Sequence, residues 1–209
     1  MSLSNKLFVS RKTILEMLKY RNINTDDYDN FSQEELELMY KAHPKITYEI
    51  NPLDMVFKEK VTVKYVLQPK LRSKDLIEVV DTMIEENVVN EGDTLIFIIR
   101  DTMKAEDTIE LNFENVYQNK KVFVQMFDIN KLMFNVTKHN LVPKHVIMSE
   151  EEKNNILKVL NLDTPNQLQI IKKTDPVAKY LGMKTGQACM IHRISPTAGY
   201  HINIRYCEL

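Results

Sequence analysis

A continuous run of apolar residues, TLIFIIR at positions 94–100, constrains the fold more than any other stretch of this chain. β-Branched and aromatic side chains dominate the run, and these residues favour strands. A strand with no polar alternation is typical of a sheet that is covered on both faces. The run therefore predicts a central strand in a layered α/β domain.

The segments on either side of this run support the same arrangement. VTVKYVLQ, from Val61, alternates like a strand, and SKDLIEVVDTMIEEN has helical spacing with Ser73 as its cap. KVFVQMF at 121–127 is a further strand, and a short helix is expected before it. Alternating strands and helices indicate one α/β domain over residues 1–135.

Two helices are expected before the first strand. SRKTILEMLKYRN has helical spacing with Ser10 as its N-cap, and Ser32 to Glu35 forms a capping box for the second helix. His43-Pro44 and Asn51-Pro52 then stop helical structure.

Residues 136–209 are expected to form a second, smaller α+β domain. Ser149 to Glu152 is a capping box that opens the helix EEEKNNILKVL, and Asp175-Pro176 opens a short helix that ends at Gly182. Segments 187–194 and 200–206 have strand character. Pro143, in Val142-Pro143-Lys144-His145, stiffens its surroundings, so this segment is interpreted as a joint between the domains, with a binding site as the alternative.

The composition is that of an ordinary folded protein, with 44% hydrophobic and 27% charged residues. Apolar runs are too short to cross a bilayer, and the N-terminus lacks a signal-peptide core, so an intracellular protein without membrane contact is expected. Residues 136–209 hold ten Lys and Arg against six Asp and Glu, whereas residues 1–135 hold 18 against 23. Neither part is basic enough for an autonomous nucleic-acid binder.

Motifs of catalysis and of cofactor binding are missing. The four glycines form no phosphate-binding loop, and the acidic runs Glu85-Glu86 and Glu150 to Glu152 have the pattern of solvated helix positions. Zinc ligation would require Cys189, His192, His201 and Cys207 together, but Cys189 and His192 lie three apart and point to opposite faces of a strand. A Cys189–His145 dyad is only a conceivable pairing. We expect no catalytic residue, metal, cofactor or small-molecule substrate.

Two motifs resemble one known family. NVTKHNLVPKHVIMSEEEKNNIL and TDPVAKYLGMKTGQACMIHRISPTAGYHINIR resemble, in this order, the signatures of the shared fifth subunit of eukaryotic nuclear RNA polymerases, a family that also has an archaeal member. DLIEVVDTMIEENV is similar to the jaw domain of the eukaryotic subunit, which the archaeal member lacks. The resemblance thus covers most of 135–206 and, more loosely, the first domain.

The resemblance implies a non-catalytic subunit of a DNA-directed RNA polymerase that acts in transcription. Residues 1–135 would be an endonuclease-like, three-layer jaw domain near downstream DNA. Residues 136–209 would be an assembly domain that docks on the largest polymerase subunit beside neighbouring subunits. The residues that match the motifs are Leu141, Pro143, Lys144 and His145 in the first, and Asp175, Pro176, Val177, Tyr180, Gly182, Gly186, Ser195, Thr197, Gly199 and Arg205 in the second.

Several positions depart from the family pattern. Pro196 stands where Glu is usual, and Tyr200, His201 and Ile204 stand where Arg, Tyr and Tyr are common. These departures bear on the contacts of the last hairpin. With the high content of Lys, Asn and Ile, they suit a divergent copy from a large DNA virus, and the expected location is then the host cytoplasm and virion rather than the nucleus.

Two further interpretations concern nucleic acid. A free-standing nuclease is the alternative function, but its metal-binding triplet is missing: Glu59-Lys-Val fails, and Glu151-Glu-Lys153 lies on a predicted helix.

The stretch KEKVTVKYVLQPKLRSK is either a DNA-facing surface or a strand edge kept soluble by lysine. Its basic residues are Lys58, Lys60, Lys64, Lys70, Arg72 and Lys74.

Overall fold

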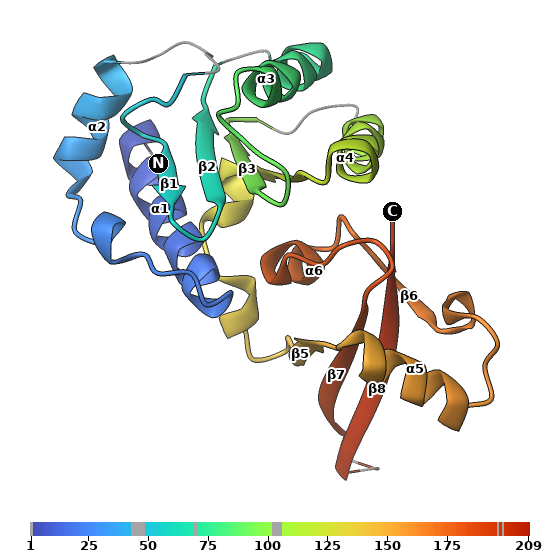
Figure 1. Cartoon of the computed structure of the whole chain (residues 1–209). Helices are drawn as coiled ribbons and strands as arrows, with labels where there is room; N and C mark the ends of the chain where they lie inside the picture. The colour runs from blue at the N-terminus through green and yellow to red at the C-terminus, as the bar shows by residue number, and fades with distance from the viewer. Residues whose placement is uncertain (1, 43–48, 69–70, 102–105, 196, 198) are drawn as a thin grey trace. The chain divides into compact units, whose positions relative to one another are not determined.

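The computed structural model describes residues 2–42, 49–68, 71–101, 106–195, 197 and 199–209 (Figure 1). His43-Pro44, Lys70 and Pro196, on which predictions were made, lie outside these residues. The chain divides into two compact units, Met1–Phe134 and Asn135–Leu209, here called unit 1 and unit 2. Each unit contains one four-stranded sheet together with helices, which confirms a mixed α/β chain.

Unit 1 is built on a sheet with the strand order β1-β2-β3-β4. β1 (Met55–Phe57) is antiparallel to β2 (Val61–Val66), and β2, β3 (Thr94–Ile99) and β4 (Phe123–Asp128) are parallel. Every residue of β2 and β4 is buried, as is all of β3 after Thr94. The apolar run at 94–100 is therefore the covered central strand that its composition predicted.

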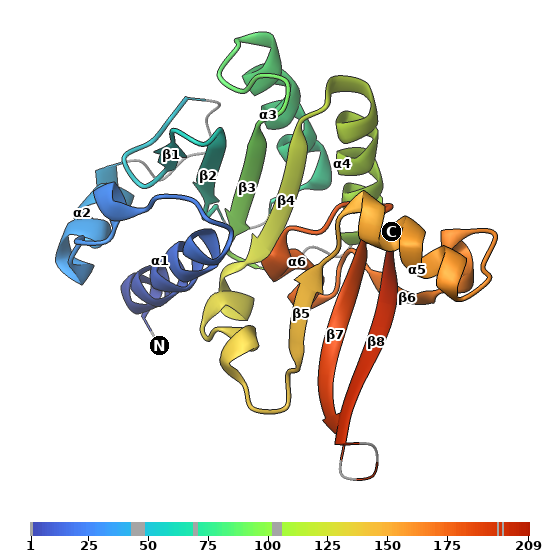
Figure 2. The ribbon, with the colours of Figure 1, turned by 60° about the horizontal axis from the view of Figure 1, so that its bottom comes forward.

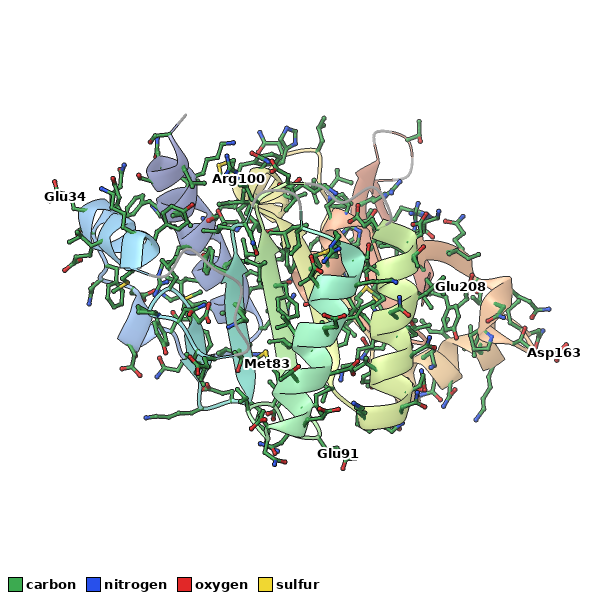
Figure 3. The ribbon with its side chains drawn as sticks, turned by 90° about the horizontal axis from the view of Figure 1, so that it is seen from above. Glu34, Met83, Glu91, Arg100, Asp163 and Glu208 are labelled. Carbon is green, nitrogen blue, oxygen red and sulfur yellow. The ribbon has the colours of Figure 1, made fainter. Side chains whose placement is uncertain are left out.

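Helices lie on both faces of this sheet. α3 (Ser73–Glu85) and α4 (Glu106–Lys120) lie side by side over one face (Figure 3), where Met83 and Phe113 join Phe97 in the core. α1 (Leu3–Tyr20) lies on the opposite face of the sheet, where Arg11 interacts electrostatically with Tyr65 of β2. η1 (Asp26–Tyr28), α2 (Gln33–Ala42) and η2 (Ile129–Leu132) complete the unit.

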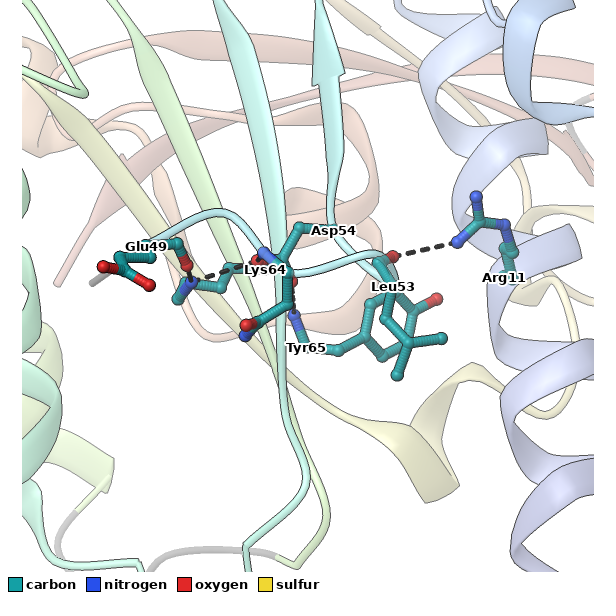
Figure 4. A network of polar contacts seen from close by, with 7 residues as sticks. Arg11, Glu49, Leu53, Asp54, Lys64 and Tyr65 are labelled. Carbon is teal, nitrogen blue, oxygen red and sulfur yellow. Dashed lines mark hydrogen bonds and ion pairs between the residues drawn. The ribbon is translucent and has the colours of Figure 1, made fainter. Parts of the chain in front are cut away.

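A buried polar network ties the segment before β1 to the sheet (Figure 4). The Lys64 ammonium lies 3.0 Å from the Asp54 carboxylate, and both side chains are 1% exposed. Lys64 also donates to the Glu49 carbonyl, and Asp54 accepts from the Tyr65 backbone N–H at 2.9 Å. Arg11 donates to the Leu53 carbonyl at 3.0 Å. The network satisfies polar groups that would otherwise be costly to bury.

Unit 2 contains a mixed sheet with the order β5-β7-β8-β6. β5 (Lys144–Ile147) pairs with residues 189–192 of β7 (Ala188–Ser195), and β6 (Gln169–Lys172) pairs with residues 205–208 of β8 (Gly199–Glu208). The whole of β7 pairs with residues 199–206 of β8, and this hairpin extends past both neighbouring strands (Figure 2). In the register of the described residues, the end of this hairpin has no third strand beside it.

The helices of unit 2 begin where the sequence predicted. Ser149 and Glu152 form the capping box of α5 (Glu150–Val159), and Asp175 caps α6 (Pro176–Leu181), which ends at Gly182 in the left-handed region (φ 72°). α6 packs on a small core that contains both cysteines, Cys189 and Cys207. η3 (Val136–Lys138) and η4 (Pro165–Gln167) are single turns.

Three local predictions were wrong. The first helix begins at Leu3 with Ser2 as its N-cap, and Ser10 lies inside it, because Leu7 continues the apolar face of Ile14 and Leu18 toward the N-terminus. Ser73 is the first residue of α3, with Arg72 at the N-cap position. The helix before β4 is not short, since α4 has 15 residues.

The interpretation of Val142 to His145 as an interdomain joint was also wrong. These residues lie within unit 2, and Lys144 and His145 belong to β5. None of the helices in the part of the chain that the structure describes is both long enough and apolar enough to cross a membrane.

Candidate interaction surface

Most residues of the second motif build α6 and the turns around it. The Asp175 carboxylate accepts from the backbone N–H groups of Val177 and Ala178 at 2.8 and 3.4 Å. Val177 packs on the core of unit 2, and the hydroxyl of the buried Tyr180 accepts from the Asn135 side-chain amide nitrogen at 3.0 Å. These residues support the fold of unit 2, and their own side chains offer little surface to a partner.

Gly186 has a turn conformation that a side chain would strain. Its φ is +93°, which L-residues rarely adopt. Its N–H donates to the Cys207 carbonyl at 3.0 Å, and its carbonyl accepts from the Lys153 ammonium at 3.0 Å. Gly186 thereby links α5 to the last strand.

The β7–β8 hairpin carries the remaining residues of the second motif. Ser195 pairs with Gly199, which has a φ of +67°, and Thr197 is exposed in the turn between them. Arg205 lies opposite Cys189 in the register. Thr197 is therefore accessible to a partner.

Asp175, Arg193 and Arg205 act electrostatically on His145 of β5. The His145 ring Nδ1 lies 2.7 Å from the Pro143 carbonyl. Burial lowers the pKa of His145; the Pro143 carbonyl and Asp175 favour its charged form, whereas Arg193 and Arg205 oppose it. His145 is thus held neutral at physiological pH, and the lasting positive charge here comes from the two arginines.

The first motif and the hairpin together line a cavity of about 770 Å³. Leu141 and Ile194 at its wall are 85% and 90% exposed, so its apolar surface is open to solvent. Lys144 and Arg193 contribute positive charge, and none of the described lining residues is acidic. The remaining lining residues are Asn140, Val142, Pro143, His192 and Tyr200.

Arg193 and Ile194 were missed as candidate residues. Their strand character was predicted, but their exposure follows from β7 extending past the end of β5, which the sequence pattern did not show. An exposed isoleucine at such a position marks surface that a partner can cover.

The basic stretch does not form one surface. Lys64 is buried and paired with Asp54, so its proposed place beside DNA was wrong. Lys58 and Lys60 precede β2, whereas Arg72 and Lys74 follow it, and six residues of strand span roughly 20 Å. Arg72 is further held by Asp75 at 2.9 Å. The described basic residues therefore form two separate pairs.

The geometry gives no support to the conceivable chemical sites. Burial raises the pKa of Cys189 to about 11, which keeps it a thiol and makes it a poor nucleophile. No cluster of three or more metal-ligating His, Cys, Asp or Glu side chains occurs within the described ranges. Lys64 and Asp54 are a lysine and a carboxylate in contact, but with 1% exposure they leave no room for magnesium and substrate. Glu151 and Lys153 lie on α5.

Comparison with known proteins points to one family. Residues 134–207 match the family model described as RNA polymerase Rpb5, C-terminal domain. The subunit rpabc1 of DNA-directed RNA polymerases I, II, and III from Dictyostelium discoideum is 28% identical over 207 residues, covering 97% of this chain and 98% of that protein. Subunit 5B of DNA-directed RNA polymerases IV and V from Arabidopsis thaliana is 26% identical, over 96% of this chain and 89% of that protein.

One relative is more similar than these two, over part of the chain. The subunit RPABC1 from Caenorhabditis briggsae is 44% identical over 85 residues, which are 41% of this chain and 40% of that protein. The resemblance predicted from the two motifs is thereby confirmed: residues 134–207 match the Rpb5 C-terminal domain, and the chain is similar over nearly its whole length to shared subunits of DNA-directed RNA polymerases.

Proposed function

We propose that this chain is a non-catalytic subunit of a multisubunit DNA-directed RNA polymerase. The observation that carries the proposal is the match along 97% of this chain and 98% of a shared polymerase subunit. Similarity over both units indicates the role of a whole subunit rather than one borrowed domain. The subunit would act where its polymerase acts, in the nucleus if the gene is cellular and in the host cytoplasm and virion if it is viral.

Within the polymerase, unit 2 is the part that docks, and its partner is the largest subunit. The cavity beside the hairpin supports this assignment, because it combines exposed apolar side chains with an unpaired end of the sheet. Exposed Leu141, Ile194 and Tyr200 supply area that a partner would remove from water. Lys144 and Arg193 favour a partner surface of negative charge.

Unit 1 is assigned to the jaw near downstream DNA, with the endonuclease-like fold that this family role implies. Support comes from helices on both faces of its mostly parallel sheet. Its DNA contact would use one of the two basic pairs, Lys58 with Lys60 or Arg72 with Lys74. Each phosphate neutralised would steepen the dependence of log K on log salt concentration by roughly 0.9.

Affinity purification of the tagged chain from its native source tests the assignment. We expect a large complex that incorporates nucleotides into RNA. Recovery of the chain alone, at 24.6 kDa, would contradict it.

A charge placed on the docking surface tests the part played by unit 2. Ile194→Asp should lower the amount of polymerase recovered by about tenfold, because it buries a charge in the interface. Val159→Asp is the matched control, since Val159 is 81% exposed on α5 and does not line the cavity. Equal recovery with both variants would remove this surface from the interface.

The DNA assignment is tested with two double variants of the assembled polymerase. Lys58→Ser with Lys60→Ser and Arg72→Ser with Lys74→Ser are compared for the salt dependence of DNA binding. One pair should reduce the slope by about one to two. An unchanged slope in both variants would show that neither pair meets phosphate.

A further inference from the structure

Unit 1 contains a second cavity, of about 560 Å³, that the polymerase assignment does not use. α1 forms one wall, and residues 28–32 with the first turns of α2 form the other. Four apolar side chains line it: Phe8, Leu15, Phe31 and Leu36. Phe8 is 37% exposed, so the apolar wall reaches the surface.

Arg11 is the central polar group of this cavity. Its side chain is 4% exposed, and its guanidinium carbon lies 5.0 Å from the ring centre of Phe31 and 5.6 Å from that of Tyr28. Both rings offer cation–π stabilisation. Arg11 is thus a buried cation that two aromatic rings hold beside a hollow.

One nitrogen of the Arg11 guanidinium has no hydrogen-bond partner among the described residues. Nη1 donates to the Leu53 carbonyl at 3.0 Å (Figure 4), whereas the buried Nε has no partner among the described residues. Nε and Nη2 share the edge with which arginine binds a carboxylate through two parallel hydrogen bonds. Burial without a paired carboxylate lowers the pKa of Arg11. An arriving carboxylate would pair with the buried charge of Arg11.

The charges around the cavity favour a ligand with a single negative charge. Arg11, Lys12 and Lys19 line it together with Glu16 and Asp29, so the lining carries a net charge of +1. Lys19 is paired with Asp29, which leaves Arg11 and the exposed Lys12 as the cations that face a ligand. A phosphate ester with two charges would meet Glu16 and Asp29 with less compensation than one carboxylate.

We propose that this cavity binds a segment of a partner protein that carries one carboxylate side chain next to a large apolar side chain. The carboxylate lies against Arg11 and Lys12, and the apolar side chain packs against Phe8, Leu15 and Phe31. The site is separate from the motif residues of unit 2, so it does not rest on the docking assignment. It adds a contact for a further protein to a subunit of this kind.

Binding is tested with small peptides and the full chain by NMR, on the Nε–Hε resonance of Arg11. The probe is acetyl-Phe-Glu-amide, and its matched controls are acetyl-Phe-Gln-amide, which lacks the charge, and acetyl-Ala-Glu-amide, which lacks the ring. We expect a dissociation constant of the order of 1 mM for the probe. Each control should bind at least about tenfold more weakly.

Two variants separate the site from general effects of charge. Lys12→Glu should raise the dissociation constant of the probe by about tenfold, since it reverses the charge of one of the two cations that face the ligand. Lys158→Glu makes the same charge change at an exposed position of α5, which lines neither cavity, and should leave binding unchanged. Lys12 is preferred to Arg11 for this test because Arg11 also holds the Leu53 carbonyl.

Several results would overturn the proposal. Equal affinity for the Glu and Gln peptides would show that the carboxylate is not recognised. Tighter binding of phenyl phosphate than of the probe, or displacement of the probe by duplex DNA, would assign the cavity to phosphate or nucleic acid instead. No saturable shift at roughly ten times the expected dissociation constant would exclude a site of this kind.

Discussion

The two sheets of this chain have the same number of strands but differ in how far these strands are buried. In unit 1, helices cover the sheet, and the strands β2 and β4 are buried throughout. In unit 2, β7 and β8 outgrow their neighbours, and Ile194, Tyr200 and Ile202 remain exposed near the free end. Apolar strand residues therefore stabilise unit 1 directly, whereas those at the end of unit 2 are available to another molecule.

Removing one large side chain from each sheet should give the largest contrast. Phe97 is fully buried and stacks on Phe113 at 6.5 Å, so Phe97→Ala should lower the free energy of unfolding by about 3–5 kcal/mol. Ile202 is 45% exposed, and Ile202→Ala should change it by less than about 0.5 kcal/mol. Urea denaturation, monitored by hydrogen exchange in each unit, measures both changes in the free energy of unfolding. Similar losses would contradict the comparison.

Breaking the buried ion pair of unit 1 should cost nearly as much. Lys64→Met leaves the Asp54 carboxylate buried without its cation, and we expect a loss of about 3–4 kcal/mol in the same assay. Lys58→Met, at an exposed position, is the control and should stay within about 0.5 kcal/mol. A loss as small as that of the control would mean that Asp54 is satisfied by backbone groups alone.

Alkaline pH should destabilise the two units in different windows. Burial raises the pKa of Tyr65 to about 12 from its ordinary 10.0, so native unit 1 binds more protons than the unfolded chain between these values. Its stability then falls as pH rises, by up to about 1.4 kcal/mol per pH unit. In unit 2, burial raises the pKa of Cys189 from 9.0 to about 11. The stability of unit 2 should therefore fall between pH 9 and pH 11.

Replacement of Tyr65 or of Cys189 should abolish the loss of stability in that residue's own pH range and leave the other loss unchanged. Tyr65→Phe should flatten the stability of unit 1 above pH 10, and Cys189→Ala should do so for unit 2 above pH 9. Unfolding midpoints measured across this range for both variants test the assignment. A decline that survives in Tyr65→Phe would have to come from another group in unit 1.

The smallest effect is expected at the helix caps, where the two units are alike. Ser149→Ala and Ser32→Ala each remove the acceptor of a capping box, which Glu152 and Glu35 complete. Each should cost about 1 kcal/mol in its own unit. Hydrogen exchange at the first turns of α5 and α2 measures the loss. A cost well above about 1 kcal/mol in only one unit would show that the serine there stabilises more than the first turn of its helix.

Features that depend on neighbouring residues in the chain were predicted well. The covered strand at 94–99, both capping boxes and the Asp175-Pro176 to Gly182 helix all follow from local patterns, because caps and turns are satisfied within a few residues. The resemblance to shared RNA polymerase subunits followed from two motifs in order along unit 2.

Features that depend on distant partners were not predictable. Lys64 occupies an alternating position that favours solvent, and its burial depends on Asp54 and the Glu49 carbonyl, which are brought over from another segment. Similarly, Val142 to His145 has the composition of a joint, and its role as part of a sheet depends on β7, more than 40 residues later. The exposure of Ile194 depends on the length of β5, which no local pattern encodes.

The position of β8 in its sheet has a consequence for synthesis on the ribosome. β8 lies between β7 and β6, and its Cys207 completes the core, so unit 2 cannot close before residue 208 has been added. All four strands of unit 1 are present once residue 128 has emerged. Unit 1 is therefore free to fold cotranslationally, while the nascent second unit must be shielded from aggregation until its last strand arrives.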